Sequence, residues 1–298
     1  MPTIRHGLPD DLPIRHLTRG DLVACADLSE DRGWPRDEHR WGLLLGAGTA
    51  YGIDDPAGKG LAAACVVTSY APSHAALGMM LVAERFARQG LGRRLVLHVF
   101  AENGETPLTL FATDQGRPLY EGLGFTTVGS VERSVGRFLP ENAPAQVPEG
   151  AHGSSAPTTR RATARDLPAI IALDAPVFGA ERTQMLARLP AFSDHFRVAE
   201  RAGELVGFAA LWPSDGSHVI GPLVAPDTDT AKALVASLAS ETDLVLRAEI
   251  DTRHTELRGW LAAHGLAAVS RTAVMTRGCE DAPGDWSRRF APLTVATG

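Results

Sequence analysis

The two halves of this chain of 298 residues repeat one pattern. Residues 14–28 (IRHLTRGDLVACADL) match residues 159–173 (TRRATARDLPAIIAL) at one constant offset, with an arginine, a threonine, an Asp-Leu pair and a final leucine at equivalent positions. At the same offset, residues 54–67 match residues 199–212, and each copy reads as a strand, an Ala-Gly turn and a second strand. Repeats of this length are domains rather than solenoid units. The sequence therefore predicts two related α/β domains in tandem.

The repeat also predicts the domain organisation. The first domain spans 14–138 and the second 159–278, and each is expected to contain a helix, a β-hairpin, a strand, a helix, a strand, a helix and a strand. Residues 139–158 are rich in Pro, Ala, Gly and Ser and lack an apolar period, which is typical of a linker. Residues 279–298 form a tail, which we expect to pack back on the second domain.

Composition excludes several classes of protein. The chain has no apolar run of about eighteen residues, so no membrane span is expected. Its first residues lack an apolar core and carry acidic side chains, which argues against a signal peptide and favours a cytoplasmic protein. The three cysteines are widely spaced, which favours neither a disulfide framework nor a metal site. A net charge of −6 provides no basic footprint for nucleic acid.

A glycine-rich segment joins a strand to a helix in the first domain. The strand 75–82 is followed by RQGLGRRLV (88–96), and a helical pattern begins at Leu91. The first turn of a helix presents unpaired N–H groups and partial positive charge, which suit a pyrophosphate, and nearby arginines could add contacts to its oxygens. A glycine pair alone fits an ordinary turn with solvated arginines equally well.

A second segment, GRPLYEGLGF (116–125), follows the glycine-rich segment and makes a comparison with known family motifs possible. Together the two segments resemble the motifs of the GNAT superfamily of CoA-dependent N-acyltransferases. The first family motif, V-x-x-x-x-[QR]-x-x-G-x-[GA], is matched by Val82, Gly90 and Gly92, and the second, L-Y-x-x-x-G-F, is matched in full at 119–125. The resemblance covers residues 14–138 and implies a mixed, mostly antiparallel twisted sheet flanked by helices.

The resemblance also implies acyl transfer from acetyl-CoA to an amine by direct attack. A backbone N–H of the strand ending at Val82 would polarise the thioester carbonyl, and Tyr120 would protonate the departing sulfur; the alternative for Tyr120 is a packed aromatic residue. Two positions depart from the family pattern, since Ala87 replaces Gln or Arg and Thr113 replaces a frequent Asn. The implied cofactor contacts are Met80, Leu81, Val82, Arg85, Ala87, Arg88, Gln89, Gly90, Leu91, Gly92, Arg93 and Thr113.

The general base is not identified by the family pattern. The positions that carry Glu or His in some family members are Ala76 and Gly78 here. His74 alternates in phase with Ala76 and is a candidate base acting through a water. The alternatives are an exposed loop histidine without a catalytic role, and an acceptor amine that loses its proton to water or has a low pKa.

The acceptor site is expected near the first helices. The segment 29–41 places Glu30 and Asp31 near Trp34 and Trp41. Acidic and aromatic side chains together suit a cationic amine. A solvated helix–turn–helix with two core tryptophans is the alternative interpretation.

The second domain lacks the elements that would bind CoA. Its counterpart of the glycine-rich segment is shorter and has Pro226, Asp227 and Asp229 in place of glycine, and Leu261 stands where the first domain has Tyr120. Carboxylates at this helix start would repel a pyrophosphate. This half resembles the degenerate second domain of two-domain GNAT proteins, whose expected role is structural or pocket-forming.

These features predict a cytoplasmic N-acetyltransferase that acts on a small-molecule amine, as a monomer or homodimer, without metal, nucleic acid or membrane partners. A non-catalytic acyl-CoA sensor and a protein-lysine acetyltransferase are the alternatives.

Overall fold

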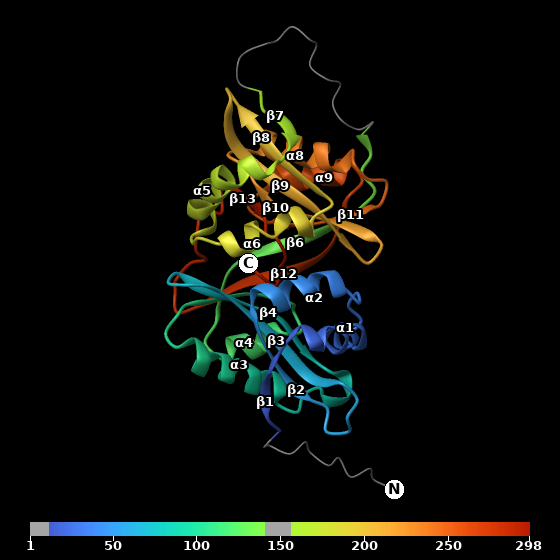
Figure 1. Ribbon diagram of the computed structural model, residues 1–298, viewed down its shortest axis with the longest axis vertical. Coiled ribbons are helices and arrows are strands. Elements are labelled where there is room, and N and C mark those ends of the chain that lie inside the picture. Colours follow the sequence, from blue (N-terminus) through green and yellow to red (C-terminus); the bar gives the residue numbers. More distant parts are fainter. Residues whose placement is uncertain (1–11, 141–155) are drawn as a thin grey trace.

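The computed structural model describes residues 12–140 and 156–298 (Figure 1). Most of the expected linker, 139–158, lies outside these residues, as does the start of the chain on which the signal-peptide argument was based. The two halves lie end to end in Figure 1, with helices on both faces of a long twisted sheet.

The first half contains the predicted elements in their predicted order, and has in addition a first strand and a second helix before the hairpin. Its segments are β1 (Ile14–Leu17), α1 (Leu22–Asp31), α2 (Glu38–Ala47), β2 (Thr49–Asp54), β3 (Leu61–Tyr70), β4 (His74–Val82), α3 (Leu91–Asn103), β5 (Leu108–Ala112), α4 (Arg117–Glu121) and β6 (Thr126–Gly136). Apolar side chains alternate along β3, so that Ala63 and Cys65 pack toward α3 while Ala64 and Val66 pack toward α1 and α2.

The second half repeats this order and adds short helices before its hairpin. Its segments are β7 (Thr158–Arg161), α5 (Leu167–Phe178), α6 (Thr183–Leu186), α7 (Leu189–Phe192), β8 (His195–Arg201), β9 (Glu204–Ser214), β10 (Ser217–Val224), α8 (Thr228–Ala239), β11 (Val245–Asp251), α9 (Thr255–Ala263), β12 (Ala267–Arg277) and β13 (Arg289–Ala291). The predicted α/β class, with a mostly antiparallel sheet flanked by helices, is confirmed.

The sequence repeat at 14–28 and 159–173 has a local cause. Thr18 and Thr163 each form a capping box with the aspartate three residues later, at the turn that leads into α1 or α5. Arg160 donates to both Asp166 and Glu200, and its hydrogen bonds to Asp166 hold the pKa of the Asp166 carboxyl well below its usual range. In the first half, Arg15 donates in the same way to Asp21 and Asp54. In both halves this arginine therefore fixes the first strand to the start of the first helix.

The halves exchange their last strands. The sheet order is β1-β2-β3-β4-β5-β12-β6-β11-β10-β9-β8-β7, with β13 paired to β10. Thus β12 of the second half pairs with β5 of the first, while β6 of the first half pairs with β11 of the second. The halves therefore share one sheet and cannot separate without breaking strand pairs.

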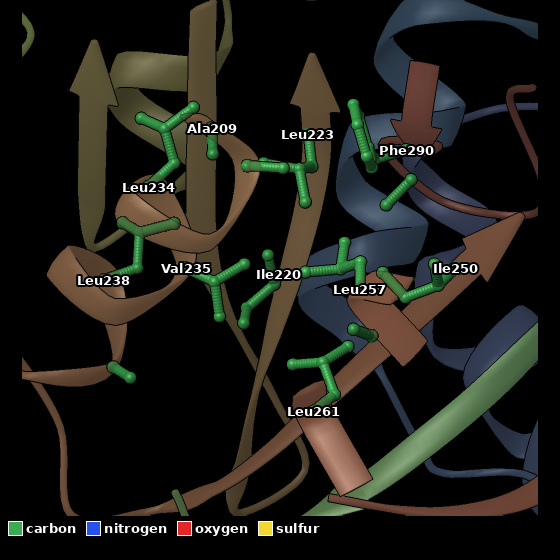
Figure 2. Close-up of a cluster of buried hydrophobic side chains, with 14 of the residues drawn as sticks. Ala209, Ile220, Leu223, Leu234, Val235, Leu238, Ile250, Leu257, Leu261 and Phe290 are labelled. Atoms are coloured by element: carbon green, nitrogen blue, oxygen red, sulfur yellow. The ribbon is translucent and has the colours of Figure 1, made fainter. Parts of the chain in front are cut away.

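The core of the second half shows how the tail joins this fold. Leu234, Val235 and Leu238 of α8 meet Leu257 and Leu261 of α9 over the sheet (Figure 2). Phe290 of β13 points into the same cluster and is 1 % exposed. The tail therefore belongs to the core of the second half rather than to its surface.

Candidate functional site

A bulge in β4 opens the sheet of the first half. Met79 has a φ of +49°, and the pairing of β4 with β3 shifts register between Ala64 and Val66. The parallel pairing of β4 with β5 stops at Leu77. Within the described chain, the β5-facing edge of β4 beyond Leu77 therefore has no strand partner, and its backbone groups can pair with a ligand.

The start of α3 lies directly beyond this opening. Its N-cap, Gly90, has a φ of +86° and no side chain that caps the helix, and a Cβ there would meet no atom within 4 Å. The first amides of α3 are therefore available to an anion. Arg88 has a φ of +60°, an uncommon backbone conformation that is typical of functional turns. This cradle of open amides fits a pyrophosphate.

The arginines around the cradle differ in their partners. Among the described residues, Arg88 and Arg93 are exposed and have no ionic partner, so both can reach a bound phosphate. The Arg85 guanidinium instead bonds the buried Asp55 carboxylate at 2.7 Å, and Arg94 donates to the Leu12 carbonyl. The sequence included Arg85 among the cofactor contacts; in this structure its side chain holds the loop to the β2–β3 turn.

The other predicted cofactor contacts surround the same opening. Met80, Leu81 and Val82 lie on β4 beyond the bulge, and Ala87 and Gln89 lie in the loop, where the Gln89 amide donates to the Arg85 carbonyl. A Cβ on Gly92 would contact Leu119 of α4 at 3.4 Å, so α4 packs against the first turn of α3.

Tyr120 lies at this contact between α3 and α4. Its side chain is 7 % exposed, and its ring meets the edge of Phe125 at a centroid distance of 5.7 Å. Its hydroxyl forms no hydrogen bond to any other described residue. Burial raises the pKa of Tyr120, so the hydroxyl keeps its proton at neutral pH. Thr113 lies nearby and accepts a hydrogen bond from the Gly116 N–H.

His74 is placed in a buried aromatic cluster, not in an exposed loop. It is 2 % exposed, with ring centroids of Tyr70 and Phe178 each 5.2 Å away. Burial, reinforced by the charges of Arg289 and Arg182, lowers the pKa of His74 to about 4. The imidazole is therefore neutral at physiological pH and a weak base.

The tail covers the face of β4 on which the family base would stand. A Cβ on Gly78 would lie 2.3 Å from the Ala296 carbonyl oxygen, and a Cβ on Gly298 would lie 3.7 Å from the Ala76 Cβ. The segment 292–298 therefore lines this side of the opening. Sequence reasoning placed the tail on the second half alone; the apolar residues after Arg289 were the only signal that it is buried.

The residues predicted to bind the acceptor differ in their burial and in their contacts. The Asp31 carboxylate accepts a hydrogen bond from the Glu84 N–H at 2.7 Å, so it braces the glycine-rich loop. Glu30 is exposed and Trp34 is 36 % exposed, and both can meet a ligand. Trp41 is fully buried and donates to Ser29, which makes it a core residue.

The equivalent opening in the second half is filled by the chain itself. The pairing of β10 with β9 shifts register after Ile220, as β4 does with β3, but β13 pairs with β10 at Leu223 and Val224. At the start of α8 the Asp227 carboxylate accepts from the Thr230 N–H and from Arg201. A strand and a carboxylate thus stand where the first half has open backbone groups.

Comparisons with known proteins agree with this geometry. Two family models, each described as an acetyltransferase (GNAT) domain, match residues 62–138 and 170–291. The chain belongs to the two-domain GNAT acetyltransferases. GNAT enzymes transfer acyl groups, and this chain is accordingly a GNAT-type N-acetyltransferase.

Individual relatives of this GNAT protein extend over most of its length. The uncharacterized N-acetyltransferase YitH of Bacillus subtilis is 29 % identical over 237 residues, which are 78 % of this chain and 80 % of YitH. A putative acetyltransferase from Pyrococcus horikoshii shares the fold with a TM-score of 0.75 and 18 % identity over 98 % of both chains. A tandem GNAT protein from the clavulanic acid biosynthesis pathway has a TM-score of 0.60 and 14 % identity, over 89 % of this chain and 98 % of its own.

The residues 12–140 and 156–298 contain no group of three or more His, Cys, Asp or Glu side chains that could hold a metal ion. None of the helices in this part of the chain has the length and apolar character needed to cross a bilayer.

Proposed function

We propose that this protein transfers the acetyl group of acetyl-CoA to the amine of a small molecule, in the first half only. The observation that carries the proposal is the pairing of an open β4 edge with an uncapped start of α3, both of which are closed in the second half. When bound there, acetyl-CoA supplies an activated thioester to an attacking amine.

The chain's own groups would perform three tasks. The amides at the start of α3, with Arg88 and Arg93, hold the diphosphate by hydrogen bonds and charge. Backbone N–H groups of β4 beyond the bulge hold the pantetheine and stabilise the charge that develops on the carbonyl oxygen. Tyr120 donates its phenolic proton to the departing sulfur, and the proton that the nitrogen loses as the amide forms returns to the tyrosinate.

The fate of the amine proton follows from the surroundings of His74. A buried imidazole with a pKa of about 4 is a weak proton acceptor. We therefore propose that the acceptor amine loses its proton to water before it attacks. The rate at subsaturating acceptor should then rise with pH until the pKa of the amine itself is reached, and acceptors of different pKa should shift the profile.

The test is the release of free thiol from acetyl-CoA in the presence of small amines and of lysine-containing peptides. Acetylation of small amines by the full chain is expected. Thiol release with peptides alone would instead assign the protein-lysine activity. Saturable binding of acetyl-CoA without thiol release across the whole panel would contradict catalysis and leave a binding protein.

A further inference from the structure

A buried cluster of charged side chains joins the two halves beside the start of α2. It contains residues of α2, of the turn before it, and of the strands β6, β9 and β11. We call it the seam cluster, and its members are Asp37, Arg40, Arg133, Ser214, Arg247 and Glu249.

The acceptors of the seam cluster are already engaged. Asp37 accepts from the Arg40 backbone N–H at 2.8 Å and from the Ser214 hydroxyl at 2.7 Å. Glu249 accepts from the Arg133 Nε at 2.9 Å, while the Arg247 Nε stands 3.6 Å from the same carboxylate oxygen. These bonds fix the cluster as a rigid arrangement that spans both halves.

The Arg40 guanidinium, in contrast, has buried N–H groups without a hydrogen-bond acceptor. Arg40 is 6 % exposed, its Nε lies 3.7 Å from the Asp37 carboxylate, and neither its Nε nor its Nη2 forms a hydrogen bond. The Nε of Arg247 is also buried without a hydrogen bond. An Arg side chain keeps its charge in proteins, and a buried donor without an acceptor is costly. The cluster thus offers donors that no described residue uses.

The charges of the cluster do not balance. Three guanidinium groups lie beside two carboxylates; Arg40 and Arg247 are largely buried, whereas the Arg133 side chain is 37 % exposed. The next carboxylate, Asp215, is exposed to solvent at the β9–β10 turn. Buried cations are normally paired with anions. The unused buried donors of Arg40 and Arg247 therefore suit an anion with two or more acceptor oxygens, which is the group that guanidinium donors bind best.

We propose that the seam cluster is an anion-binding site for a carboxylate or phosphate group, with Arg40 and Arg247 as its principal donors. Such a site gives the second half a role, because Ser214, Arg247 and Glu249 all come from it. The anion is either a free ion or the acidic group of the acceptor; the second source rests on the proposed acetyl transfer, whereas the first does not.

Inorganic phosphate tests the site without any assumption about catalysis. Thermal unfolding of the full chain is followed as phosphate replaces chloride at constant ionic strength. Phosphate should raise the midpoint of wild type saturably, since a ligand that binds only the folded state stabilises it. In Arg40→Gln and Arg247→Gln the half-saturating concentration should rise at least tenfold. Arg36→Gln is the matched control, because Arg36 precedes α2 but pairs with the surface carboxylates Asp27 and Glu38.

Acceptor kinetics distinguish the two sources of the anion. An ω-amino acid is compared with the alkylamine of equal chain length in wild type, Arg40→Gln and Arg36→Gln. If the acceptor supplies the anion, only Arg40→Gln raises the KM of the amino acid, about tenfold with kcat little changed, and it leaves the alkylamine unaffected. Equal KM changes for both acceptors, together with the phosphate effect, assign the site to a free ion.

The proposal is overturned if phosphate stabilises Arg40→Gln, Arg247→Gln and Arg36→Gln equally, or if no saturable stabilisation is seen and the acceptor pair is not discriminated. Arg40→Gln should fold, because the Asp37 carboxylate keeps its hydrogen bonds from the backbone N–H of residue 40 and from the Ser214 hydroxyl. If it does not, Arg247→Gln carries the test. Should no amine be acetylated at all, the phosphate titration still decides on the site.

Discussion

Ala296 lies against Gly78 on β4 so closely that a methyl group on Gly78 would come within 2.3 Å of the Ala296 carbonyl oxygen and 2.5 Å of its Cα. The next residue of the tail, Thr297, accepts a hydrogen bond of 2.5 Å from the buried Tyr70 hydroxyl. Gly78 and Ala296, more than 200 positions apart, thus meet on β4, the strand that the resemblance makes the wall of the catalytic opening. The tail is therefore part of the first half as well as of the second.

Gly78→Ala should lower the thermal stability of the protein. The added methyl group meets backbone atoms, which cannot turn aside as a side chain would, so the tail must move. We expect a loss of about 1–3 kcal/mol in the free energy of unfolding, which is typical of overpacking. Gly42→Ala, on α2 with no atom within 4 Å of its Cβ, should instead stabilise the protein by about 0.5–1 kcal/mol. Equal effects of the two substitutions on chemical denaturation curves would contradict the close contact.

Gly90→Ala should weaken the binding of acetyl-CoA. An alanine at a φ of +86° is strained, and relief of that strain would turn the first amides of α3 away from the diphosphate. The expected rise in Kd is about tenfold, or about 1.4 kcal/mol. Gly104→Ala is the matched control, since Gly104 ends the same helix, also has a positive φ and has open space around its Cβ. Calorimetric titrations in which both variants bind equally would remove Gly90 from the site.

Tyr120→Phe should reduce turnover about 10²- to 10⁴-fold, the usual contribution of a general acid. The affinity for acetyl-CoA should stay unchanged, because the lost hydroxyl forms no hydrogen bond to the rest of the described chain. Tyr51→Phe, in the same apolar cluster and 6 % exposed, should leave turnover intact. The comparison is made by single-turnover thiol release. Full activity of Tyr120→Phe would leave Tyr120 as a packing residue.

The local features of the fold were accessible from the sequence. The repeated Thr and Asp-Leu motif, which forms the capping boxes at Thr18 and Thr163, and the loss of the glycine-rich loop before α8 depend on short-range patterns, and the structure has both. The order of elements was predicted apart from β1 and α2. The start of α3 at Leu91 was predicted from the helical pattern that follows the glycines. Such patterns depend only on the few neighbouring residues that form one helix end or one turn.

The long-range features were not accessible in the same way. An exchanged strand has the same alternation of inward and outward side chains as a strand that stays in its own half. The sequences of β6 and β12 therefore did not indicate which strands they pair with. Trp41 was considered for ligand contact because exposure cannot be read from residue type, and the structure buries it fully. Arg40 was missed for the same reason, because a single arginine in a helix is usually exposed.

His74 should make the stability of the protein depend on pH. Its pKa in the folded protein is about 4, below the ordinary value of 6.5, so the unfolded chain binds the proton more tightly. The contribution of neutral His74 is complete above pH 6.5 and is lost as the pH falls toward 4, for a total of about 3 kcal/mol. His74→Phe keeps a ring between Tyr70 and Phe178 but cannot be protonated. Urea unfolding of both proteins at pH 7 and pH 5 should show wild type losing about 2 kcal/mol more than the variant. The other histidines with lowered pKa values, the partly exposed His195 and His254, contribute equally to both proteins and cancel in the comparison. An equal loss in the two proteins would mean that His74 is not held neutral by its surroundings, and would restore it as a candidate base.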